Sequence, residues 1–194
     1  MQLKSYLPAA TLIFLISCGS NNQSANTSDS SQTKADSTNT MKDSSASASI
    51  TQQDTKFAVD ATNIGMMEIA LGNVAQQNAM RKDVKDFGAM MVKDHTGAAD
   101  DLKKIADAKH ITLPSSLSAD DQKKVDDMKA KTGNKFDKAY IDMMIDGHKK
   151  AADEFQDEIK SGSDADLRAF ATKTLDVIHA HLDSAQKCKS MQKS

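Results

Sequence analysis

The spacing of the apolar residues constrains the fold of this chain more than any other feature. Apolar side chains recur every three or four residues through most of residues 54–189, which is the spacing of one face of an α-helix. Proline occurs only at positions 8 and 114, and no stretch alternates with the two-residue period of a strand. The pattern predicts an all-α protein.

Four such stripes predict four long helices, over residues 54–78, 82–109, 134–160 and 164–189. In chain order, the stripes consist of Phe57, Ala61, Ile64, Glu68, Leu71 and Ala75; Val84, Phe87, Met91, His95, Ala98, Leu102 and Ile105; Phe136, Tyr140, Met144, His148, Ala151, Phe155 and Ile159; and Leu167, Phe170, Thr174, Val177, His181, Ala185 and Cys188.

The connection between the second and third helices is long enough to cross the length of a bundle. Ser118 and the residues after it have the signature of a short capped helix. A long crossover makes helices two and three parallel, and one short, one long and one short connection is the ferritin-like arrangement. The predicted domain, residues 54–190, is therefore a four-helix ferritin-like bundle with a short helical insert between helices two and three.

One polar residue interrupts each stripe near its middle: Glu68, His95, His148 and His181. The two central histidines lie in a repeat, because MMVKDHTGAADDL (90–102) aligns without a gap with MMIDGHKKAADEF (143–155). A buried charge or imidazole is costly unless it is paired or binds a metal. Bundles build metal sites from ligands that point inward from facing helices, so these four residues are predicted metal ligands.

Estimated heights place three of the four residues at one level. At 1.5 Å per residue, His95 and His148 are level on parallel helices, which we expect to be adjacent, and Glu68 is within roughly one turn. His181 is offset from His148 by roughly 7 Å, which makes it the least secure member. Asp94 points roughly 100° away from His95 and is not an expected ligand.

The type of metal depends on which side chains join the histidines. Met91 and Met144 precede the repeated histidines by four residues, on the same helix face. Thioether with imidazole suits copper, whereas imidazole with carboxylate suits zinc, iron or nickel. Core packing is the favoured role of both methionines. The expected cofactor is a transition metal (Zn, Cu or Fe), with binding that weakens below about pH 6 as imidazoles gain protons.

A hydrogen-bonded network is the alternative explanation for the four polar residues. Glu68 could accept from the histidines without a metal, in a non-catalytic structural or protein-interaction module whose polar core only fixes helix packing. No nucleophile elbow, phosphate loop or Cys-x-x-Cys occurs, so an enzyme is the less favoured interpretation. A net charge of −2 and 4% aromatic residues disfavour nucleic acid as a partner. Protein partners and a homo-oligomer remain open.

The beginning of the chain predicts a lipoprotein. Residues 1–17 have the organisation of a secretory signal, and LISCGS resembles the bacterial lipobox, whose cysteine, here Cys18, carries lipid. Residues 18–53 are rich in Ser, Thr and Asn and are predicted to be a disordered tether. We expect anchoring to the lipid bilayer in the cell envelope. Gly19 favours the outer membrane, with the domain in the periplasm or at the cell surface. Cys188 then has no intramolecular disulfide partner.

Four stretches together resemble a known family: EIALG (68–72), FGAMMVKDH (87–95), FDKAYIDMMIDGH (136–148) and AFATKTLDVIHAHL (169–182). The family is the bacterial domain of unknown function 4142, secreted or membrane-anchored and related to ferritin-like bundles. The resemblance covers about residues 54–188 and implies a four-helix bundle outside the cytoplasm, with no established reaction.

A carboxylate-bridged di-iron centre is not expected. True ferritins carry Glu-x-x-His on two helices, but Val92, Ile145 and Ile178 lie three residues before the histidines here. The expected function is an envelope lipoprotein with a transition metal in its core, with a role in stress response among the options.

Overall fold

The structure, a computed structural model, describes residues 50–192. The predicted signal peptide, Cys18 and most of the predicted tether lie outside these residues. The described residues form α2 (Gln52–Asn78), α3 (Lys82–Lys109), α4 (Ala119–Lys129), α5 (Gly133–Ser161) and α6 (Ala165–Met191), with no strand among them. The prediction of an all-α bundle is confirmed. Within residues 50–192, no helix carries an apolar stretch long enough to cross a bilayer.

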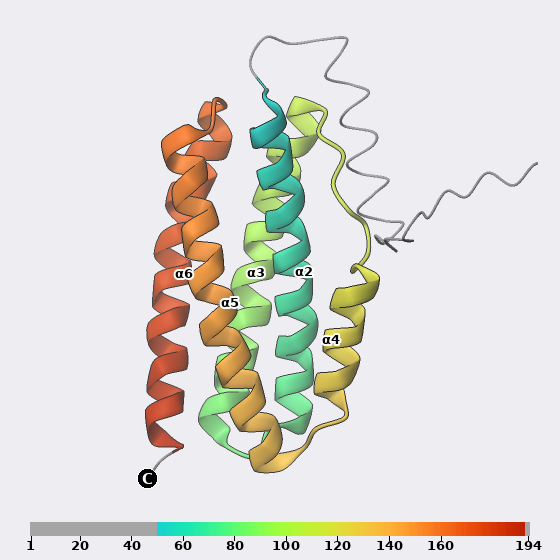
Figure 1. Cartoon of the computed structure of the whole chain (residues 1–194), viewed down its shortest axis with the longest axis vertical. Helices are drawn as coiled ribbons and strands as arrows, with labels where there is room; N and C mark the ends of the chain where they lie inside the picture. Colours follow the sequence, from blue (N-terminus) through green and yellow to red (C-terminus); the bar gives the residue numbers. More distant parts are fainter. Residues whose placement is uncertain (1–49, 193–194) are drawn as a thin grey trace, which may run out of the picture.

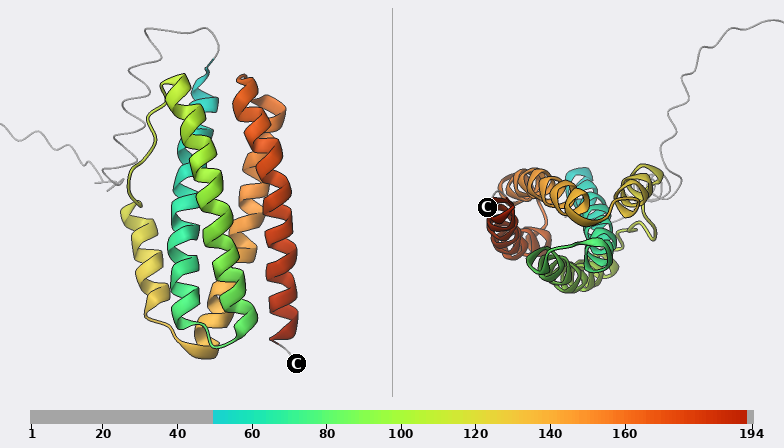
Figure 2. Two further views of the ribbon diagram at one scale, coloured as in Figure 1. Left: turned by 180° about the vertical axis from the view of Figure 1, so that it is seen from behind. Right: turned by 90° about the horizontal axis from the view of Figure 1, so that it is seen from below.

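The four long helices are arranged as two antiparallel hairpins, α2 with α3 and α5 with α6 (Figure 1). The segment after α3 returns along the outside of the bundle, and α4 packs against α2 (Figure 2). Helix α5 therefore starts at the same end as α3 and runs parallel to it, as the long crossover predicts.

The parallel helices α3 and α5 occupy opposite corners of the bundle, so the expectation that they are adjacent is wrong. Helix α2 packs on α3 and α5, and α6 packs on the same two helices (Figure 2). The short connections make the two helices of each hairpin neighbours. The hairpins dock through α2 on α5 and α3 on α6, so every neighbouring pair is antiparallel and the parallel pair lies on a diagonal.

Buried carboxylates close the two ends of the bundle. The hydroxyl of Thr51 accepts from the Asp54 N–H, and Asp54 accepts from the Thr51 N–H at 2.8 Å, so α2 starts two residues before the expected position. Asp54 also accepts from the backbone N–H of Ser163 at 2.7 Å, which ties the two hairpins together. At the opposite end, Asp137 accepts from the N–H groups of Met80 and Arg81.

Two glycines let α2 and α3 approach closely. A Cβ at Gly72 would lie 2.7 Å from the carbonyl oxygen of Gly88, and a Cβ at Gly88 would lie 2.7 Å from the Cβ of Ala75. No larger residue fits either position without moving a helix. The first hairpin is therefore held at a separation that only glycine allows.

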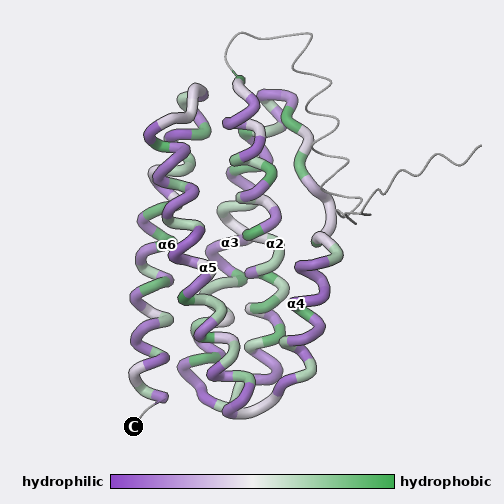
Figure 3. The backbone as a smooth tube through the Cα atoms, in the orientation of Figure 1, coloured by the Kyte–Doolittle hydropathy of each residue, from purple (hydrophilic) through white to green (hydrophobic). Residues whose placement is uncertain are grey.

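The predicted stripes face the interior. Every stripe residue is buried or half-buried, and Figure 3 shows apolar and polar residues recurring along each long helix. The apolar core is divided into two clusters. One surrounds Phe57, Phe155 and Phe170, and the other surrounds Phe136 and Tyr140. The four polar interruptions lie between these clusters along their helices.

Candidate metal centre

One nitrogen from each of His95, His148 and His181 lies within 4.8 Å of the other two. These side chains come from α3, α5 and α6, and Glu68 joins them from α2. All four residues are buried, with exposed fractions of 7% for His95, 2% for Glu68 and 1% for each of the other two histidines. Ligand atoms around a metal with bonds of roughly 2.1 Å stand about 3.3–4.2 Å apart. The three nitrogens are thus within small side-chain adjustments of a common ion.

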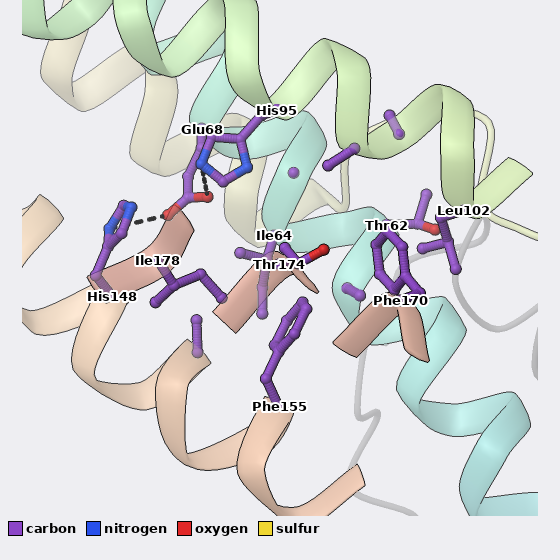
Figure 4. A pocket seen from close by; sticks show the side chains of 15 residues that line it. Thr62, Ile64, Glu68, His95, Leu102, His148, Phe155, Phe170, Thr174 and Ile178 are labelled. Atoms are coloured by element: carbon purple, nitrogen blue, oxygen red, sulfur yellow. Dashed lines mark ion pairs between the residues drawn. The ribbon is translucent and has the colours of Figure 1, made fainter. Parts of the chain in front are cut away.

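Glu68 lies between two of the histidines (Figure 4). Its Oε2 is 3.0 Å from Nε2 of His95, and its Oε1 is 3.3 Å from Nδ1 of His148. The close approach to His95 does not have hydrogen-bond geometry. Neither Oε2 of Glu68 nor Nε2 of His95 has a hydrogen-bond partner in the described part of the chain. Because orphaned buried polar atoms are costly, this pair indicates a position for a further species.

The hydrogen bonds of the other two histidines orient their free nitrogens toward each other. Nδ1 of His148 donates to the backbone carbonyl of Met144 at 2.9 Å, which leaves a lone pair on Nε2. Nε2 of His181 donates to the carboxylate of Asp94 at 3.0 Å, which leaves a lone pair on Nδ1. Acceptors behind metal-binding histidines hold the ring and its tautomer in this way.

His181 belongs to the cluster together with His95 and His148. The height offset of roughly 7 Å expected between His148 and His181 does not predict the distance between their ring nitrogens. His148 lies thirteen residues before the end of α5 and His181 sixteen after the start of α6, so their Cα atoms differ in height by roughly 4.5 Å. Side chains lean toward the N-terminus of their own helix. On antiparallel helices the two rings therefore lean together, and Nε2 of His148 reaches 3.3 Å from Nδ1 of His181.

Burial changes the protonation of the site. Loss of solvation raises the pKa of Glu68 to about 8. Loss of solvation, with repulsion from the other histidines, lowers the pKa of His95 to about 3. The pKa of His148 falls to about 4 because of burial and of His181. Without a cation, both imidazoles are neutral at pH 7 and Glu68 holds a proton. A proton therefore competes with the metal for Glu68 already near pH 8, above the value of about pH 6 expected from the imidazoles alone.

Asp94 is a functional candidate that the sequence pattern does not reveal. It lies off the stripe of α3 and contacts His181 of the neighbouring helix α6, rather than the site directly. Its position next to His95 is the one signal in the sequence, but its partner appears only in the folded bundle. Met91 and Met144 are fully buried in the apolar cluster around Phe136 and Tyr140, which accounts for both as packing residues.

Fold and site together define a four-helix bundle with a histidine and carboxylate cluster in its core. The chain belongs to the family described as domain of unknown function (DUF4142), which it matches over residues 39–188. No curated protein and no solved structure matches the chain significantly.

Proposed function

We propose that this protein binds one divalent transition metal ion in the core of its bundle, through His95, His148, His181 and Glu68. The observation that carries the proposal is the convergence of three imidazole nitrogens within 4.8 Å, beside the unpartnered Oε2 of Glu68 and Nε2 of His95. Three nitrogens and one carboxylate oxygen suit zinc or iron(II) better than copper(I), which prefers sulfur.

The proposed setting is the cell envelope. The lipobox-like sequence before Cys18 and the polar segment after it support a bundle held on a tether outside the cytoplasm. In this setting the protein would bind or buffer a metal at the membrane, including under stress. Binding of the metal is the activity that these residues support.

Metal uptake by the full chain, purified without a histidine tag, tests this function. The chain is equilibrated with micromolar zinc, iron(II) or copper, and the bound metal is counted by elemental analysis. We expect about one ion per chain and a higher melting temperature, by mass action. Failure of the wild type to take up any of the three metals would overturn the proposal.

A matched pair of histidine variants on α6 separates the site from general surface binding. His181→Gln removes a buried ligand, whereas His179→Gln changes an exposed imidazole two residues away. Affinity should fall at least tenfold in the first variant and stay unchanged in the second, with helical content preserved in both. An equal loss of metal affinity in the two variants would indicate that the metal binds at the surface. Absence of uptake in the wild type would favour a hydrogen-bonded network that only fixes helix packing.

A further inference from the structure

Gly65 is a buried glycine in the middle of α2 that no close contact explains. Glycine is less favourable than alanine inside a helix, so a buried one normally marks a tight approach. Gly72 and Gly88 fit this rule. At Gly65, by contrast, an added Cβ would meet nothing within 4 Å. The residue leaves open space inside the bundle, one turn from Glu68.

The space beside Gly65 is a cavity of about 30 Å³ that extends away from the histidines (Figure 4). Its walls are mainly apolar and include Ala61, Ala151, Phe155 and Ile178. The hydroxyl of Thr62 is already bonded to the Ala58 carbonyl. At the other end the cavity reaches Glu68, His95 and His148, so it has one polar end and one apolar end.

We propose that this cavity binds a small uncharged diatomic molecule, such as dioxygen or nitric oxide, beside the metal. An anion would find no cationic side chain among the lining residues. A water molecule needs two to four polar partners, and the apolar end offers only the hydroxyl groups of Thr174 and of Thr62, which is already bonded. The volume admits a molecule of about two heavy atoms. The position of this molecule beside a metal rests on the proposed function. Its binding in the apolar cavity does not.

A groove between α3 and α6 supplies the route from solvent. It has a volume of about 440 Å³ and is lined by charged side chains, including Asp100, Lys104 and Lys173. The groove and the cavity share His95, Ala98, Phe170 and Thr174 as lining residues. One layer of side chains therefore separates them.

Xenon binding to the metal-free full chain tests the cavity independently of the metal, since xenon enters dry apolar cavities. We expect one xenon site per chain by xenon nuclear magnetic resonance. Gly65→Leu should fill the space and weaken xenon binding at least tenfold. Gly147→Leu is the control, because a Cβ at Gly147 also meets nothing within 4 Å and this residue does not line the cavity. It should bind xenon as the wild type does.

Nitric oxide added to iron(II)-loaded protein tests whether the occupant reaches the metal. An iron–nitrosyl signal in electron paramagnetic resonance should appear in the wild type and weaken in Gly65→Leu, with iron content unchanged. Metal uptake without xenon binding overturns the cavity inference alone. Xenon binding without metal uptake supports the cavity but overturns the proposed function and the placement beside a metal. Xenon and iron binding without a nitrosyl signal also overturn that placement.

Discussion

Nε2 of His148 and Nδ1 of His181 face each other at 3.3 Å while the second nitrogen of each ring contacts an acceptor oxygen. If both rings are neutral and donate to those acceptors, two lone pairs point at one another. A shared cation removes this repulsion, either as an extra proton or as a metal ion. Burial disfavours the extra proton on His148, whose pKa is lowered to about 4. The proposed metal ion would remove the repulsion without that proton.

Metal binding at pH 7 should release about one proton, from Glu68. The pKa of this carboxyl is raised to about 8 by burial, so it is protonated before the metal arrives. Affinity should fall as the pH drops below about 8, while the neutral imidazoles contribute little until more acidic values. Titration calorimetry in buffers of different ionisation enthalpy measures the proton count, and Glu68→Gln should abolish the release. Release that begins only below about pH 6 would place the competing protons on the histidines instead.

Asp94→Asn should weaken metal binding by about 10–100-fold, the usual effect of losing an acceptor behind a metal-binding histidine. The amide can present its NH2 to Nε2 of His181 and stabilise the wrong tautomer. Competition titration with a chelating dye measures the change. Asp107→Asn, on the same helix but paired with Lys103 at the surface, is the control and should bind as the wild type. Identical affinities in the two variants would rule out a role for Asp94.

Stability should decline as the pH rises from about 4.5 to about 7, because of Glu158. Burial and the neighbouring Asp54 carboxylate raise the pKa of this carboxyl to about 7. A carboxyl with a raised folded-state pKa stabilises the fold fully below its unfolded value of 4.5 and loses that contribution as it ionises. Glu158→Gln should therefore be more stable than the wild type above pH 7, by about 1–3 kcal/mol. Urea unfolding at pH 5 and pH 8 checks this, and a difference of the same size at both values would contradict the assignment.

Gly88→Ala should destabilise the bundle by about 1–3 kcal/mol, because the new methyl group enters the contact between α2 and α3. Its position would be 2.7 Å from the Cβ of Ala75 and 2.8 Å from the carbonyl oxygen of Gly72. Gly65→Ala, with open space at its Cβ, should instead increase stability by about 0.5–1 kcal/mol. Thermal melts of both variants give opposite signs if the packing is as described. Destabilisation by both would mean that the space at Gly65 is not open.

Cys18→Ser should release the protein from membranes. The expected lipidation at Cys18 would hold the wild type in the membrane fraction, and serine cannot carry the thioether-linked lipid. Fractionation followed by immunodetection measures the distribution, and Cys188→Ser serves as the control. Retention of the Cys18 variant in the membrane fraction would contradict the anchor.

The helices could be predicted because their signals are local. Apolar periodicity and caps such as Ser118 reflect neighbours within a few turns, and α3 has the expected bounds of 82–109. The four polar interruptions were visible for the same reason, since each breaks the stripe of its own helix. Their convergence required only that all four stripes face one core.

The remaining features depend on how helices distant in sequence meet. The partnership of Asp94 with His181 arises because α3 packs beside α6, which no spacing within α3 indicates. The ring of His181 reaches the ring of His148 because the two side chains tilt toward each other on antiparallel helices. An estimate from Cα heights alone does not include this tilt. The open space at Gly65 depends on the volumes of residues from all four long helices, so the sequence offers only an isolated glycine there.

The pairing of the helices into hairpins has a consequence for the order of assembly. The α2–α3 hairpin carries Glu68 and His95, and the α5–α6 hairpin carries His148 and His181. Neither hairpin alone holds three donors, so high-affinity coordination can arise only after the two halves dock. A bound ion would then form its contacts after the folding transition state and would slow unfolding rather than speed folding. Removal of the ion by a chelator would shorten the lifetime of the native state.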